Sequence, residues 1–178
     1  MAEKNLSLTV LKKYLKTCSK EELIDDISEL CQKFKPVKDF YQIRLSPQAE
    51  LLVSNKYRKT IEDEFFPARG LGKARLAIAK KAISEFKKVS QTPDSLVDIM
   101  LFYIEQGVKF TNEYGDIDEP FYISMETMYE KTIELINQYK LHNIFQARCL
   151  KIVKDTSDIG WGFHDTLQDI YSGGFGID

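Results

Sequence analysis

The chain has 178 residues, of which 43% are hydrophobic and 29% charged, a composition typical of a soluble globular protein and unlike that of a disordered chain. This length favours one domain with a substantial hydrophobic core. The net charge of −2 is unevenly distributed, because residues 1–91 contain 19 Lys and Arg against 12 Asp and Glu (net +7), whereas residues 92–178 contain 6 against 15 (net −9). Such asymmetry fits either a bipolar binding surface or basic and acidic helices that face one another.

In the first half of the chain, apolar spacing and cap signals predict five helices. Leu8, Leu11 and Leu15 repeat at helical spacing, and Ser19 with Glu22 forms a capping box before the next helix. The predicted helices cover residues 8–15, 20–34, 38–45, 47–66 and 73–89. The fourth is predicted to start with Ser46 as N-cap and Pro47 as its first residue.

The second half is organised around a helix that begins at Thr92 and Pro93. It contains six consecutive apolar residues, 99–104, so it is apolar on nearly every side and is expected to cross the core. An acidic turn, 113–119, follows it. Further helices are predicted at 120–139, 141–153 and 163–171, with Gly160 as a helix stop.

No segment shows the alternating pattern of a strand. The sequence therefore predicts an all-α fold of eight or nine helices in antiparallel pairs, arranged as a compact bundle or as a short superhelical, HEAT-like stack. We expect a single helical domain over residues 1–171 and a flexible tail over 172–178.

The composition also indicates a compartment. The longest apolar run is far shorter than the ~20 residues that cross a bilayer, and the polar N-terminus lacks the apolar segment of a signal peptide. Cys18, Cys31 and Cys149 form an odd set without CxxC spacing, which favours buried free thiols over disulfides. We expect a cytoplasmic protein without a membrane partner.

The acidic turn is the first candidate site. Glu113, Asp116, Asp118 and Glu119 place four carboxylates within seven residues, and such oxygens suit hard cations such as Mg²⁺ or Ca²⁺. The turn does not fit an EF-hand loop, because aligning Gly115 with the glycine of that loop puts aromatic residues at ligand positions. A structural interpretation competes, since Asp118 and Glu119 also stand where acidic residues cap a helix.

The segment from Asp158 to Asp165 is the second candidate. It contains the single tryptophan, Trp161, and one of the two histidines, His164. Beside acidic neighbours, His164 could act as a general base or a metal ligand. In the alternative interpretation, Trp161 anchors the last helix and His164 is hydrogen-bonded nearby.

A basic face over residues 69–88 is the third candidate, because its positive side chains could neutralise phosphates. Its members are Arg69, Lys73, Lys80, Lys81, Lys87 and Lys88. The loop at Arg69–Lys73 lacks the spacing of a P-loop, and the face lacks interleaved aromatic residues, which favours a solvated lysine surface.

Three stretches resemble a known family. They are residues 79–88 (AKKAISEFKK), 110–122 (FTNEYGDIDEPFY) and 159–167 (IGWGFHDTL). The chain resembles, over most of its length, a family of uncharacterised bacterial proteins, domain of unknown function 6155. The resemblance implies one small stand-alone domain and supplies no substrate, cofactor or catalytic residue.

Three functional hypotheses follow. The leading hypothesis is a module that binds another macromolecule, most simply a protein, through the surface of a helix pair. The first alternative is a metal-dependent enzyme in which the acidic turn and His164 converge; it would use a divalent metal, although the absence of any cofactor is favoured. The second is nucleic-acid binding through the basic face. The absence of GxSxG, HExxH or a cysteine in a recognisable histidine context argues against an enzyme without excluding one.

Overall fold

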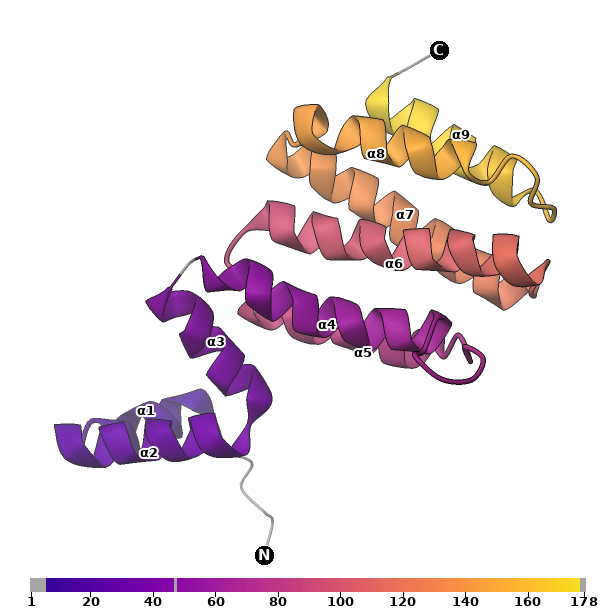
Figure 1. Ribbon diagram of the computed structural model, residues 1–178. Coiled ribbons are helices and arrows are strands. Elements are labelled where there is room, and N and C mark those ends of the chain that lie inside the picture. The colour runs from indigo at the N-terminus through magenta and orange to yellow at the C-terminus, as the bar shows by residue number, and fades with distance from the viewer. Residues whose placement is uncertain (1–5, 47, 177–178) are drawn as a thin grey trace, which may run out of the picture.

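The computed structural model describes residues 6–46 and 48–176. Within these ranges the chain forms nine α-helices and no strand, which confirms the predicted all-α fold (Figure 1). The helices are α1 (Leu8–Leu15), α2 (Lys20–Lys33), α3 (Lys35–Leu45), α4 (Ala49–Phe65), α5 (Leu76–Val89), α6 (Pro93–Tyr114), α7 (Glu119–Tyr139), α8 (His142–Lys154) and α9 (Phe163–Phe175).

Helices α4 to α9 form three antiparallel pairs, α4/α5, α6/α7 and α8/α9, which are stacked in layers (Figure 1). Helix α4 packs on α6, and α7 packs on α9. Helix α3 packs against α4 and α5 at one side of the stack, and α2 packs against α3. This layered order corresponds to the stack that the sequence offered as an alternative to a bundle.

The middle layer carries the predicted central helix. Helix α6 contacts α4, α5, α7 and α8, and eleven of its 22 residues are buried. Buried side chains from α3 to α9 form one continuous hydrophobic cluster. The prediction that the 99–104 run crosses the core is therefore confirmed.

Three connecting loops lie together at one end of the stack, which we call the loop end (Figure 1). They are residues 66–75, 115–118 and 155–162. Helix α6 stops there because Gly115 adopts φ +87°, a conformation that favours glycine. Phe110 lies beneath this end and packs against aromatic rings of three elements.

Glu50 and Glu64, two of the three buried carboxylates among the described residues, shape the first half of the stack. Glu50 accepts hydrogen bonds from the Ser90 hydroxyl at 2.5 Å and from the Thr92 backbone N–H at 3.4 Å, so it holds the turn between α5 and α6. Glu64 receives two hydrogen bonds from Arg75, at 2.7 and 2.9 Å. Sequence analysis singled out neither, because each partner lies at least eleven residues away in the chain.

Some predicted boundaries were wrong. Helix α9 continues through Phe175 instead of ending at 171, because the Phe175 ring packs 4.9 Å from Tyr171 and 5.6 Å from His142. Packing there outweighs the weak helix preference of two glycines. Only residues 177–178 of the expected tail lie outside the described residues.

Other boundaries shifted by a few residues. Ser46 ends α3 rather than starting α4, which begins at Ala49; Pro47, its expected first residue, lies outside the described residues. Helix α5 begins at Leu76, not 73, and α8 ends at Lys154, so Gly160 lies in a loop instead of stopping a helix.

The cysteines are free thiols, as expected, but only one is buried. Cys18 and Cys31 are half-buried, whereas Cys149 is fully buried. Burial raises the pKa of the Cys149 thiol to about 12, so it is not reactive near neutral pH.

None of the described helices has the length and apolar character needed to span a membrane.

Candidate functional site

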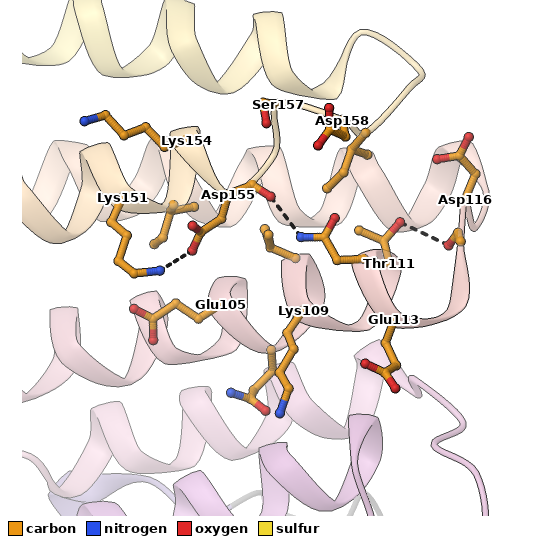
Figure 2. Close-up of a pocket in the computed structure, with 16 residues that line it drawn as sticks. Glu105, Lys109, Thr111, Glu113, Asp116, Lys151, Lys154, Asp155, Ser157 and Asp158 are labelled. Carbon is orange, nitrogen blue, oxygen red and sulfur yellow. Dashed lines mark hydrogen bonds and ion pairs between the residues drawn. The ribbon is translucent and has the colours of Figure 1, made fainter.

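An open groove of about 1030 Å³ lies between the C-terminal half of α6, the end of α8 and the loop that follows α8 (Figure 2). Its apolar lining includes Val108, Ile152 and Ile159, which are almost fully buried. Its other walls are polar and charged. The exposed surface of the groove is therefore mainly polar and charged, over buried apolar side chains.

Charge is not evenly spread along this groove. Its charged residues are Glu105, Lys109, Glu113, Asp116, Lys151, Lys154, Asp155 and Asp158. Figure 2 shows the two lysines of α8 toward one side and Asp116 with Asp158 toward the loop end. Glu105 lies on the same side as these lysines, so that side carries both signs of charge, whereas the loop end is acidic.

Two of the groove lysines are available to a ligand. Lys151 pairs with Asp155 at 2.5 Å, but Lys109 and Lys154 are exposed and form no ion pair within the described part of the chain. The Lys109 ammonium lies 4.4 Å from the centre of the Phe66 ring, which positions its side chain beside the end of α4. These exposed amines could bind carboxylates of a partner.

One end of the groove is fixed by an ion-pair network. Arg148 on α8 binds Glu105 on α6 through two hydrogen bonds of 2.6 and 2.8 Å, and it binds Asp98 at 2.7 Å. Arg58 on α4 contacts the other oxygen of Asp98, also at 2.7 Å. Burial alone would lower the pKa of Arg148, but the hydrogen bonds and charges of the two carboxylates outweigh it and raise that pKa.

The predicted acidic turn is divided between two surfaces. Glu113 and Asp116 line the groove, and the hydroxyl of Tyr122 donates a hydrogen bond of 3.1 Å to Asp116. Burial raises the pKa of Tyr122, so its hydroxyl remains a donor near neutral pH. Asp118 instead caps α7, because its carboxylate accepts a 2.9 Å hydrogen bond from the Phe121 N–H.

Glu119, the fourth carboxylate, lies in a separate pocket beside Lys80. The structural interpretation of the turn is therefore correct for Asp118, and the four carboxylates do not share one site.

His164 does not share a site with the carboxylates of the turn. The loop approaches Asp116 at Gly160, where an added Cβ would lie 3.2 Å from a carboxylate oxygen. The imidazole Nδ1 of His164 is hydrogen-bonded to the Thr156 hydroxyl at 3.0 Å, and His164 is absent from the groove lining. No three His, Cys, Asp or Glu side chains among residues 6–46 and 48–176 are arranged to hold a metal ion.

One interpretation of the sequence had Trp161 anchoring the last helix, and it is wrong. Its side chain is 62% exposed and its backbone has φ +64°, next to Gly162 at φ +69°. The anchor is Phe163, which is fully buried and lies 4.9 Å from the Tyr122 ring. The backbone is left-handed at both Trp161, whose ring is exposed, and Gly162, directly before the buried Phe163.

The six residues of the predicted basic face are all exposed. Arg69 and Lys73 lie in the loop between α4 and α5, whereas the other four lie on α5. In the described part of the chain, these six make one ion pair, between Lys81 and Glu85 of the same helix. The basic face is therefore solvated and is not neutralised by the acidic half of the chain.

Sequence analysis missed most of the groove. Lys109, Lys151, Lys154 and Arg148 lie on helices that the sequence predicts, but they carry no local motif. They come together only because α6 and α8 lie side by side, and Arg148 forms its ion pair with Asp98, 50 positions away in the chain. A pattern read within one helix could not reveal them.

Comparison with known protein families gives one match, over residues 6–173, to a family described as a family of unknown function (DUF6155). No curated protein and no solved structure matches the chain. The match covers nearly all of the chain and agrees with the resemblance carried by its three characteristic stretches. The chain belongs to the DUF6155 family.

Proposed function

We propose that this protein binds another protein and that the groove between α6 and α8 receives a segment of that partner. The observation that carries the proposal is the groove itself: it is open, about 1030 Å³ in volume, and lined mainly by polar and charged side chains. That volume is at the upper limit of small-molecule pockets, and its openness suits a chain that continues beyond it. Stacks of helix pairs commonly present such extended surfaces.

The charge distribution defines the partner segment. An acidic residue would bind Lys109 or Lys154, and a basic residue would meet Asp116 and Asp158. Complementary charges of this kind fix the direction of a bound segment and raise its association rate. The groove therefore favours a segment with opposite charges at its two ends.

The two other hypotheses fit this surface less well. Among the described residues, the groove lining contains no histidine, so the metal-dependent enzyme that would combine the acidic turn with His164 is not supported by this surface. The nucleic-acid hypothesis concerns the basic face over residues 69–88 and not the groove, whose five carboxylates and three lysines would repel a phosphate backbone.

Site-specific photo-crosslinking tests the proposal. We expect benzoylphenylalanine in place of Lys109 or Lys154 to crosslink one defined protein in cells that express the variant. The matched control is the same residue in place of Lys88, an exposed lysine on α5. Crosslinks to that protein from both groove positions and not from α5 would support the groove. Crosslinks from α5 alone would contradict it and point to the basic face.

A further inference from the structure

The first two helices expose an unusual amount of apolar surface. Eighteen large hydrophobic side chains are exposed among the described residues, and eight of them fall within residues 6–34. These eight are Leu6, Leu8, Val10, Tyr14, Ile24, Ile27, Leu30 and Phe34. Single exposed apolar residues are ordinary, but a concentration on one short segment marks an interaction surface.

Both helices are amphipathic, yet neither buries a residue. On α2, the stripe formed by Leu23, Ile27, Leu30 and Phe34 repeats at helical spacing, and three of these four side chains are at least 39% exposed. Figure 1 shows α1 and α2 beyond α3 and away from the stacked pairs. Helix α2 packs on α3, whereas α1 has no extensive contact with any other described helix.

The two helices also carry opposite charges. Helix α1 and its flanks, residues 6–19, contain Lys12, Lys13 and Lys16 and no acidic residue, a net charge of +3. Helix α2 contains five acidic residues and two lysines, a net charge of −3. Among the described residues, no ion pair joins α1 to α2, so these charges remain available to another molecule.

We propose that this surface binds a second copy of the chain, with α1 of each protomer packed on α2 of its partner. A two-fold axis makes the contact occur twice, so +3 faces −3 at both places. The four helices would form a bundle in which the exposed leucine, isoleucine and phenylalanine side chains become its core. The surface is thus complementary to itself, which a different partner would not require.

A charge-swap experiment on the full chain tests the α1-to-α2 pairing. The first variant, Lys12→Glu/Lys13→Glu/Lys16→Glu, makes both helices −3, and the second, Glu21→Lys/Asp25→Lys/Asp26→Lys, makes both +3. Sedimentation should show wild type at twice 20.6 kDa and each variant alone as a monomer. An equimolar mixture of the two should restore the dimer, because each α1 again faces an oppositely charged α2.

A second pair of variants tests the apolar contact. Ile27→Asp/Leu30→Asp should raise the dimer dissociation constant by on the order of 100-fold, because positions 27 and 30 are buried in the proposed dimer interface. The control, Leu51→Asp/Leu52→Asp, changes two exposed leucines of α4 and should leave that constant unchanged. Circular dichroism of each variant verifies that the helices still form.

Three results would overturn the proposal. The first is a monomeric wild type at tens of micromolar, and the second is a dimer that persists in the Ile27/Leu30 variant. The third is a failure of the mixture to restore association, which would exclude the pairing of α1 with α2 even if the protein dimerises. None of these results depends on whether the α6–α8 groove binds a partner.

Discussion

Replacing Phe110 with alanine is expected to lower the free energy of unfolding by about 3–5 kcal/mol. The Phe110 side chain is 8% exposed, and its ring lies 5.8 Å from Phe65, 6.0 Å from Phe66 and 6.3 Å from Phe121. It therefore joins α4, α6 and α7 beneath the loop end. Removing the ring leaves a cavity that backbone atoms of three elements would have to close together, and aromatic contacts add to the loss.

The control for this prediction is Tyr114→Ala. Tyr114 also contacts Phe110, at 4.8 Å, but it is 48% exposed at the edge of the cluster. Its replacement should cost less than about 1 kcal/mol. Urea titrations followed by circular dichroism measure both values. Equal losses in the two variants would show that Phe110 is not the centre of the packing at this end.

Replacing Arg148 with methionine is expected to lower the free energy of unfolding by about 2–4 kcal/mol. The substitution leaves Glu105 without a partner and Asp98 with Arg58 alone, in a network whose side chains are only 25–32% exposed. Leaving carboxylates unpaired in such surroundings lowers the free energy of unfolding by more than the loss of a surface ion pair does. Because the network joins α8 to α6, we expect the same variant to loosen one end of the groove.

A double-mutant cycle isolates this effect. Adding Glu105→Gln to the Arg148→Met variant should recover part of the loss, because no negative charge would remain opposite the methionine. Lys151→Met serves as the comparison, since its ion pair with Asp155 is solvent-exposed and should contribute less than about 0.5 kcal/mol. If Lys151→Met lowered the free energy of unfolding as much as Arg148→Met does, the Arg148 network would not be a main source of stability.

Local signals predicted the helices because those signals act within a few residues. The capping box of Ser19 and Glu22 forms both of its hydrogen bonds, at 3.1 and 2.7 Å. Asp118 caps α7 as one interpretation of the acidic turn required. Six consecutive apolar residues placed α6 in the centre of the stack. In each case, the chemistry of neighbouring residues was enough.

The groove could not be predicted in this way, because it depends on which helices lie side by side. Glu113 and Asp116 carried a local acidic signal and do line the groove, whereas Asp118 and Glu119 shared that signal and face elsewhere. The backbone turns at Gly115, so Glu113 at the end of α6 and Glu119 at the start of α7 line different pockets although both are acidic. The position of α8 beside α6 then supplies the opposite wall.

The most direct test of the binding proposal is the equilibrium affinity for the protein that is crosslinked from the groove. Isothermal titration would compare wild type with Lys109→Glu/Lys154→Glu and with the control Lys80→Glu/Lys87→Glu, which changes net charge equally on another face. We predict that the groove variant binds at least about tenfold more weakly, whereas the control stays within about twofold. Unchanged affinity in the groove variant, with a loss in the control, would contradict the proposal and assign binding to α5.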